Sequence, residues 1–436
     1  MDTIFALATA PGRAAIAVMR LSGPESGRIL ATLCGRLPPS RRASVRRLRD
    51  MAGTVLDEAL VLWMPGPRSY TGEDSAELHL HGGGAVIAGV GAALVAAGAR
   101  PAEPGEFTRR AVLNGRMDLT AAEGVIDLIE AETAAQASQA LRLAGGGLAS
   151  LCDGWAERLT ALLARQEALI DFEGEGLPQT LERQVRDSVV VLAREIEARL
   201  TEDAGGERVR AGLDIAILGP PNAGKSSLLN ALVGREAAIV SARAGTTRDI
   251  VEARMVLAGL PATLADTAGL REAGDEIEAE GVRRALKRGE AADIVIAVLA
   301  PDLAPDPATL DLIRRRPCVL VAGKADLGEP AGPGMPDGAL PISARTGVGL
   351  AALRARLEEE ARRLVPTAQT ALLTRPRHRA ALRDTLGWLE EAERATLPEL
   401  RADALREALR ALGRLTGRVG AEAILDRVFA EFCLGK

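Results

Sequence analysis

A phosphate-binding pattern, Gly-x-x-x-x-Gly-Lys-Ser, occupies residues 219–226, between the apolar run "LDIAIL" and the helical pattern "SLLNAL". Between a strand and a helix, such glycines let backbone N–H groups close around phosphate oxygens at the helix N-terminus. Lys225 would place a point charge on the β- and γ-phosphates, and Ser226 would offer its hydroxyl to Mg²⁺. An ordinary glycine turn is the alternative, but it leaves the flanking strand and helix unexplained. The pattern therefore predicts a nucleotide-binding α/β domain.

Two polar segments downstream fit the same domain. "AGTTRD" supplies Thr246 and Thr247 in a loop that would close on Mg²⁺ and the γ-phosphate. "TLADTAGLRE" follows a strand, so Asp266 would lie at the strand end near the metal, and the N–H of Gly269 would contact the γ-phosphate. In order and spacing, these segments resemble the G1, G2 and G3 elements of translation-factor-type GTPases.

The choice of base is expected to reside in "AGKADLG", where the GTPase pattern is Asn-Lys-x-Asp and Gly323 replaces the asparagine. Asp326 can accept two hydrogen bonds from guanine that adenine cannot donate, and the stem of Lys324 can lie on the base. "ISARTG" (342–347) resembles the G5 element. We therefore expect GTP rather than ATP. The expected nucleotide contacts are Asn222, Ala223, Gly224, Lys225, Ser226, Ser227, Thr246, Thr247, Asp266, Thr267, Ala268, Gly269, Lys324, Asp326, Ser343, Ala344 and Arg345.

The residue after Asp-Thr-Ala-Gly is Leu270, where Ras-like proteins carry a glutamine that orients water, so another group must position the nucleophile. Asn222 resembles the residue that coordinates potassium in cation-dependent GTPases. Such an ion could replace the positive charge of an arginine finger, which the sequence does not identify. A bracing role for Asn222 within its own loop is an equally good interpretation.

Length and composition favour a cytoplasmic protein of about three domains. The chain has 436 residues, 47% of them apolar, and no uncharged apolar run of the roughly 18 residues that a membrane span requires. Its four cysteines are widely separated, which indicates neither a disulfide framework nor a zinc site. His79 and His81 are expected on one face of a strand, but the sequence shows no third ligand nearby, so we assign no metal to them.

The pattern of apolar residues divides the chain into four blocks. Residues 1–117 carry short strand-like runs and one apolar helical stretch, which predicts an α+β domain. Residues 118–210 and 366–436 have apolar residues at helical spacing, and residues 211–365 alternate between strands and helices. The fold class we predict is an α/β P-loop G domain inserted into a discontinuous all-α helical domain, preceded by the α+β domain. Such an insertion requires that its two ends lie close together.

Outside the G motifs, several segments resemble the MnmE (TrmE) family of bacterial tRNA-modification GTPases. They include "ATAPGRAAIAVMRLSG", "PGPRSYTGED", "RPAEPGEFTRRAVLNGRMDLTAAEG" and the terminal "FCLGK". The resemblance covers nearly the whole chain. It implies a folate-binding and dimerising N-terminal domain, two halves of a helical domain and a G domain inserted between them.

The resemblance also implies roles for individual residues. A formyl- or methylene-tetrahydrofolate ligand would contact Arg20, Glu77, Arg116 and Lys436. K⁺ would be held by Asn222, Ser241, Arg243 and Thr246, and Mg²⁺ by Ser226 and Thr247. Glu278 would act as the general base of hydrolysis, beside the catalytic Lys225. In the terminal segment, Cys433 would meet the one-carbon chemistry, although a tail that merely packs on the N-terminal domain remains open.

We expect a homodimeric, K⁺-activated GTPase that works in a heterotetramer with the flavoprotein MnmG. GTP hydrolysis would control transfer of a folate-borne carbon unit to the wobble uridine of tRNA, with FAD on the partner. The alternatives are a regulatory GTPase of ribosome assembly and a folate-dependent enzyme whose G domain is only structural. The net charge of −5 counts against the first, and the intact phosphate loop counts against the second.

Overall fold

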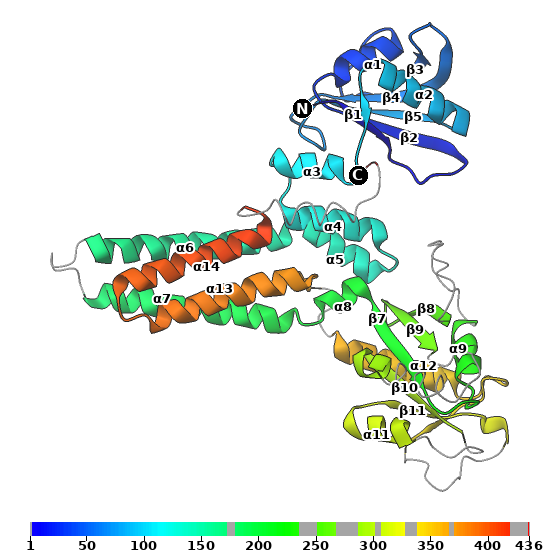
Figure 1. Ribbon diagram of the computed structural model, residues 1–436, viewed down its shortest axis with the longest axis vertical. Helices are drawn as coiled ribbons and strands as arrows, with labels where there is room; N and C mark the ends of the chain where they lie inside the picture. Colours follow the sequence, from blue (N-terminus) through cyan, green and yellow to red (C-terminus); the bar gives the residue numbers. More distant parts are fainter. Residues whose placement is uncertain are drawn as a thin grey trace, which may run out of the picture. The chain divides into compact units, whose positions relative to one another are not determined.

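The computed structural model describes residues 2–171, 179–234, 251–266, 287–300, 307–327, 338–365, 370–418 and Gly435. The chain divides into two compact units (Figure 1). Unit 1 comprises Met1–Ile126, Leu143–Ala193 and Ala381–Lys436, and unit 2 comprises Asp127–Arg142 and Arg194–Ala380. Across the described ranges, no helix combines the length and the apolar character needed to span a bilayer.

Unit 1 begins with a six-stranded sheet in the order β3-β4-β5-β2-β1-β6. The strands are β1 (Ile4–Leu7), β2 (Ala14–Ser22), β3 (Ser44–Arg49), β4 (Val55–Met64), β5 (Ser75–Gly82) and β6 (Arg100–Pro101). Along β5, the buried Leu78 and Leu80 alternate with the more exposed His79 and His81, as in a strand that buries one face. The buried face packs on α1 (Ser26–Cys34) and α2 (Gly84–Ala96) in one apolar core. The predicted α+β character is confirmed.

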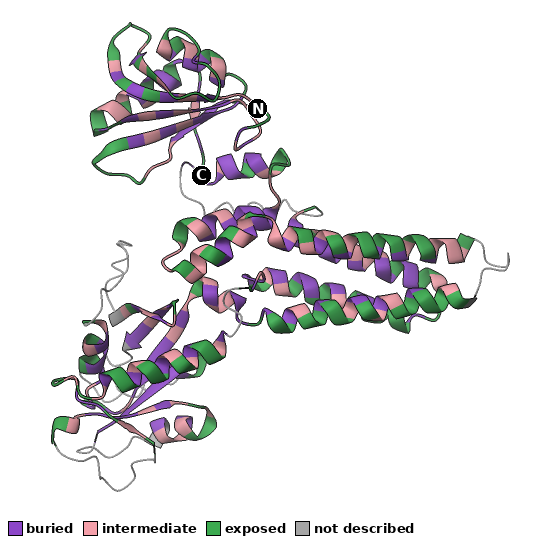
Figure 2. Cartoon of the chain, turned by 180° about the vertical axis from the view of Figure 1, so that it is seen from behind, coloured by how far each residue is buried: buried purple, intermediate pink, exposed green. Residues whose placement is uncertain are grey.

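Helices form the remainder of unit 1, and some of them continue into unit 2. They are α3 (Glu106–Leu113), α4 (Leu119–Glu130), α5 (Ala134–Ala144), α6 (Gly147–Asp171), α7 (Gln179–Glu202), α13 (Pro376–Arg394) and α14 (Pro398–Thr416). The long helices bury one face and expose the other (Figure 2). Arg401 on α14 is fully buried and donates to the carbonyl oxygens of Ala392 (3.2 Å) and Ala395 (2.7 Å). It thereby satisfies carbonyl groups that the end of α13 leaves unpaired.

Unit 2 contains a second six-stranded sheet, in the order β12-β11-β10-β7-β9-β8. All neighbouring strands are parallel except β8 and β9. The strands are β7 (Leu213–Leu218), β8 (Val251–Leu257), β9 (Leu260–Asp266), β10 (Ile294–Leu299), β11 (Val319–Ala322) and β12 (Leu340–Pro341). The helices are α8 (Gly206–Ala211), α9 (Lys225–Val233), α11 (Pro307–Arg315) and α12 (Leu350–Leu364), with the 3-10 helix η1 (Ala325–Leu327). This is the α/β fold that the phosphate-binding pattern predicts.

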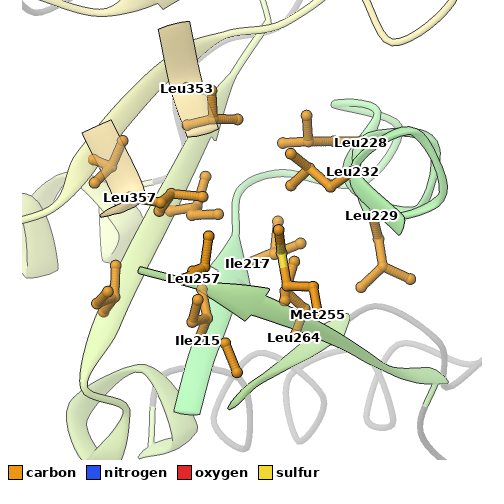
Figure 3. Close-up of a cluster of buried hydrophobic side chains, with 14 of the residues drawn as sticks. Ile215, Ile217, Leu228, Leu229, Leu232, Met255, Leu257, Leu264, Leu353 and Leu357 are labelled. Atoms are coloured by element: carbon orange, nitrogen blue, oxygen red, sulfur yellow. The ribbon is translucent and has the colours of Figure 1, made fainter. Parts of the chain in front are cut away.

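The core of unit 2 lies between the sheet, α9 and α12. Figure 3 shows Ile215 and Ile217 of β7 in one apolar cluster with Leu228 of α9 and Leu353 of α12. β10 is buried along its whole length, as expected for a parallel strand covered on both faces. The packing therefore fixes β7 and α9, which hold the phosphate loop between them.

The chain segments that lead into and out of this α/β fold are joined by polar contacts. Asp203 accepts hydrogen bonds at Oδ2 from the backbone N–H groups of Leu372 (2.8 Å) and Leu373 (3.0 Å). The side-chain amide of Gln139 donates to one carbonyl oxygen in each segment, at 3.2 Å. The two ends of the inserted fold thus lie side by side, as the insertion requires.

A buried carboxylate joins the same two segments. Asp127 accepts a hydrogen bond from Nε of Arg210 (2.9 Å), a residue that precedes β7. It also accepts bidentate hydrogen bonds from both terminal nitrogens of Arg375 (2.8 to 3.1 Å), a residue that follows α12. Arg375 and Asp127 are both nearly enclosed, so the pair is charge-assisted and screened from water. We call Asp127, Gln139 and Asp203 the clamp.

Candidate functional site

The phosphate loop of unit 2 lies between β7 and α9, where close packing selects glycine. At Gly219 the backbone φ is 149°, and a Cβ atom would lie 2.2 Å from the carbonyl oxygen of Val298. No other residue can occupy that position without moving β10. Gly224 has a φ of 95° and caps α9 in the left-handed region. The loop therefore has the backbone geometry that the pattern predicts.

Lys225 is the first residue of α9, and its side chain turns back over the loop. The residue is only 6% exposed, and Nζ donates to the carbonyl oxygens of Gly219 (2.9 Å) and Pro220 (2.8 Å). The ammonium group is thus held at the mouth of the loop beside the helix N-terminus. A phosphate bound there would meet both the positive end of the helix and this charge.

The other loop residues differ in exposure. Ala223 is buried, whereas Asn222, Ser226 and Ser227 are exposed at the loop tip and at the start of α9. Asn222 adopts a left-handed backbone with a φ of 61°, which is uncommon outside glycine and costs backbone energy. The hydroxyl groups at the start of α9 are accessible from solvent, as a ligand to Mg²⁺ would need to be.

The base-recognition segments follow β11 and β12 and lie next to each other. The Asp326 carboxylate accepts hydrogen bonds from Oγ of Ser343 (2.7 Å) and from Nε of Arg345 (2.9 Å). The Ser343 hydroxyl, and then the Arg345 guanidinium, lower the pKa of Asp326, so the carboxylate stays ionised at neutral pH. Lys324, one residue after the Asn position of the GTPase pattern, has a left-handed φ of 57°.

Gly323 brings the base segment against the phosphate loop. A Cβ atom at this position would lie 3.0 Å from the carbonyl oxygen of Ala223 and 3.4 Å from Cγ1 of Val298. Its N–H donates to the carbonyl oxygen of Leu299 at 2.7 Å. The two predicted halves of the nucleotide site are therefore adjacent in unit 2.

A second candidate site lies on the N-terminal sheet of unit 1. Arg20 and Glu77 are cross-strand partners on β2 and β5, and Nε and Nη2 of Arg20 donate to Oε1 of Glu77 at 3.2 and 3.0 Å. The guanidinium carbon lies 5.2 Å from the ring centre of Tyr70 and 5.8 Å from that of Phe107, within cation–π range. Sequence reasoning missed both rings, although Tyr70 is the only tyrosine in a chain with 2% aromatic residues.

Two nitrogen atoms around Glu77 lack hydrogen-bond partners among the described residues. They are the buried Nη1 of Arg20 and the buried Nε2 of His79, which lies 3.7 Å from Oε2 of Glu77. A buried guanidinium donor without a partner is costly, so a ligand that offers an acceptor atom to Nη1 of Arg20 would be stabilised here. Arg116 is exposed, and its side chain lies beside Gly72, where a Cβ atom would be 3.2 Å from Cγ of Arg116.

Gly435 is buried against the end of β1. A Cβ atom at Gly435 would lie 2.3 Å from the carbonyl oxygen of Leu7, and its φ is 95°. In the β1–β2 ladder, Ala6 pairs with Arg20 and Leu7 pairs with Met19. This residue of the terminal segment therefore lies beside the pair of strands that carries Arg20.

Several predicted site residues lie outside the described residues. They are Ser241, Arg243, Thr246, Thr247, Thr267, Ala268, Gly269, Leu270, Glu278, Cys433 and Lys436. For Asp266 the structure places the backbone at the end of β9 and does not describe the side chain. Their assigned roles stay predictions.

Family models match almost the whole chain. The model described as the GTP-binding protein TrmE N-terminus matches residues 3–116, and the model described as the MnmE helical domain matches residues 119–433. The chain belongs to the MnmE family. The resemblance found in the sequence is thereby confirmed.

Members of the MnmE family resemble the chain along its full length. A protein of Gluconacetobacter diazotrophicus, named tRNA modification GTPase MnmE, is 58% identical over 99% of this chain and 98% of its own length. Its namesake from Granulibacter bethesdensis is 52% identical over 100% of this chain and 99% of its own length.

Solved structures match a smaller share of the chain. The G domain of the T. maritima FeoB iron transporter is 27% identical and covers 34% of this chain and 98% of its own, with a TM-score of 0.26. Era in complex with MgGDPNP and part of 16S ribosomal RNA is 25% identical and covers 34% of this chain and 56% of its own, with a TM-score of 0.27.

Proposed function

We propose that this chain is a GTP hydrolase that acts in tRNA modification. The observation that carries the proposal is the phosphate loop of unit 2, with the buried Lys225 at the start of α9, in a member of the MnmE family. Relatives at 58% and 52% identity are named tRNA modification GTPases. The reaction is transfer of the γ-phosphoryl group of GTP to water.

In the nucleotide site, the loop N–H groups and Lys225 bind the phosphates. Lys225 then exchanges its two carbonyl contacts for phosphate oxygens and stabilises charge on them in the transition state. Asp326 accepts hydrogen bonds from guanine, and as an ionised carboxylate it can only accept. Ser226 and Thr247 would hold Mg²⁺, which neutralises phosphate charge when bound.

The absence of a glutamine at position 270 supports two further assignments. Glu278 would orient the attacking water and accept its proton. Asn222, with Ser241, the backbone of Arg243 and Thr246, would hold K⁺, which when bound supplies positive charge at the β/γ bridge. The left-handed backbone and the exposure of Asn222 at the loop tip are compatible with this role.

The Arg20 site of unit 1 would bind a formyl- or methylene-tetrahydrofolate. The ring of the folate would lie near Tyr70 and Phe107, and acceptor atoms of the ligand would pair with the free Nη1 of Arg20. Glu77 holds Arg20 from its other edge and offers its second oxygen to donors. Arg116 and Lys436 would contact the ligand from outside the sheet.

The terminal segment would complete the folate site. The contact of Gly435 with the end of β1 supports this, because β1 pairs with the strand that carries Arg20. Gly435→Ala should displace the tail, since both its left-handed φ and the 2.3 Å approach to Leu7 exclude a side chain. Folate titration should then show weaker binding with unchanged GTP hydrolysis. Unchanged folate affinity in Gly435→Ala would leave the tail a packing element.

The modification itself would add a folate-borne carbon unit at C5 of the wobble uridine. A cytoplasmic homodimer of this chain would act with an MnmG-like flavoprotein, which supplies FAD, in a heterotetramer on tRNA. The G domain would couple hydrolysis to the chemistry through movement. Domain limits near residues 117, 210 and 365 separate the folate, helical and G-domain roles.

The test uses a matched pair of lysine variants in the full-length protein. Lys225→Ala should abolish GTP hydrolysis, and in cells that lack the gene it should fail to restore modified wobble uridine in tRNA nucleoside analysis. Lys287→Ala removes an exposed lysine of the same unit and should leave both activities at the wild-type level. A folded Lys225→Ala protein that hydrolyses GTP would overturn the nucleotide assignment, and normal tRNA in cells that lack the gene would overturn the role in modification.

A further inference from the structure

Asp326 has two hydrogen-bond partners of opposite character. Ser343 is 1% exposed, whereas the Arg345 side chain is 76% exposed, and the Asp326 side chain between them is 15% exposed. Ser343 Oγ donates to Oδ1, and Arg345 Nε donates to Oδ2. Oδ1 is therefore contacted from the protein interior and Oδ2 from the solvent side.

The interior contact is fixed by its surroundings. Ser343 Oγ also accepts a hydrogen bond from the N–H of Thr346 at 3.2 Å, and the N–H of Ser343 donates to the carbonyl oxygen of Val348 at 3.0 Å. Arg345 instead reaches Asp326 with a long side chain that is mostly in solvent. A molecule that approaches the carboxylate from solvent must therefore displace or share the arginine contact.

We propose that Arg345 competes with the 2-amino group of guanine for Oδ2 of Asp326 and so gates nucleotide binding. The proposal rests on the proposed function, because it takes Asp326 as the residue that recognises the base. Guanine donates from N1–H and from its 2-amino group, and a carboxylate can accept both. With Arg345 in place, one of these donors faces an oxygen that already holds a cationic donor.

The competition predicts a difference between two nucleotides. Hypoxanthine has the N1–H donor of guanine but no 2-amino group, so inosine diphosphate presents one donor to the carboxylate and can pair with Oδ1 alone. Loss of the Arg345 side chain should therefore increase the affinity for guanosine diphosphate more than the affinity for inosine diphosphate. Exposed ion pairs of this kind change equilibrium constants by about 1.4- to 5-fold. The gain for guanosine diphosphate should fall within that range.

The experiment titrates GDP and IDP into the full-length protein and into Arg345→Ala. Tighter GDP binding in Arg345→Ala, by about two- to fivefold, with a smaller change for IDP, is the expected result. The two ligands carry the same phosphates, so general charge effects cancel in the ratio of their dissociation constants. Arg362→Ala removes an arginine of similar exposure from α12 and should change neither affinity.

A variant at the carboxylate separates this proposal from the site assignment. Asp326→Asn should lose the preference for GDP over ADP, and adding Arg345→Ala to it should have no further effect. If Asp326→Asn keeps that preference, the base site is assigned wrongly and the gate fails with it. If Asp326→Asn loses the preference but Arg345→Ala binds GDP no more tightly than wild type, the site stands and Arg345 is a positioning residue instead.

Discussion

Gly323→Asn restores the asparagine of the GTPase pattern, and the structure lets its effect be worked out. The φ of Gly323 is outside the left-handed region, so a side chain causes no backbone strain. The added Cβ atom would lie 3.0 Å from the carbonyl oxygen of Ala223, which is a few tenths of an ångström too close. It would also lie 3.4 Å from Cγ1 of Val298, which is an ordinary contact. The cost of the substitution therefore comes mainly from one contact with the phosphate loop.

Gly323→Ala measures that cost by itself. Overpacking costs about 1 to 3 kcal/mol in a rigid core, and a loop carbonyl that can shift should place the cost near the lower end. The asparagine adds an amide to the same Cβ, and one net hydrogen bond contributes about 0.5 to 1.5 kcal/mol. The ratio of the GTP dissociation constants of the two variants isolates the contribution of the amide, because both variants carry the same Cβ atom.

We expect Gly323→Asn to bind GTP about two- to thirteenfold more tightly than Gly323→Ala. Relative to wild type, the asparagine variant should also gain affinity if the loop yields to the Cβ at low cost. The assay is equilibrium titration of a fluorescent GTP analogue, with ATP as the competing nucleotide to measure discrimination. An asparagine variant that binds no more tightly than the alanine variant would refute the reasoning and show that another group already occupies the amide's place.

Three further predictions concern catalysis and stability. GTP turnover should be much faster in K⁺ than in Na⁺, and Asn222→Ala should remove that difference, whereas equal rates of the wild type in the two salts would contradict the cation role. Glu278→Ala should lower kcat by roughly a hundredfold or more with nucleotide binding retained, and an unchanged kcat would reassign the residue. Asp127→Asn should lower the free energy of unfolding by about 3 kcal/mol, because two arginines lose a buried partner. In urea unfolding, Asp153→Asn at the exposed pair with Arg418 should cost less than about 1 kcal/mol, and equal losses in the two variants would refute the burial argument.

The expected loss of unfolding free energy in Asp127→Asn lies at the low end for a buried ion pair, because the two arginines that contact Asp127 differ in exposure. Arg375 is nearly enclosed, whereas Arg210 is 30% exposed and lines a cleft of about 470 Å³, where water can solvate it. Rehydration of Arg210 offsets part of the cost that an unpaired guanidinium would otherwise carry.

The phosphate loop was predictable because each residue type in its sequence pattern is required by the local backbone conformation. Gly219 and Gly224 are needed for close approach and for a left-handed φ, and the neighbouring strand and helix are part of the same short segment. The helices α1 and α3 were not predicted, since each is short and lies among Gly and Pro residues that indicate turns. Local pattern is a weak guide where tertiary packing selects the helix.

Most side-chain contacts between distant residues could not be predicted. Asp127 and Arg375 are 248 positions apart, and nothing in either segment identifies its partner. The pairing of Arg345 with Asp326 is closer in sequence, yet the resemblance of residues 342–347 to G5 does not indicate it. Such pairs form because of the way the helices and strands pack. That packing cannot be deduced from the charges and spacings along one sequence.

The clamp bears on how hydrolysis can act at a distance. Asp127, Gln139 and Asp203 tie the two ends of the α/β fold to each other and to α4 and α5 through buried hydrogen bonds. Unit 2 accordingly contains Asp127–Arg142 as well as the α/β fold, and its limits fall inside helices α4, α5, α7 and α13. A displacement of the G domain that left Asp127 of α4 behind would have to break the enclosed Asp127–Arg375 pair, whereas one that carries this end of α4 along would not. In the proposed mechanism, Asp127 and the α/β fold should therefore move together, because the clamp holds them to each other.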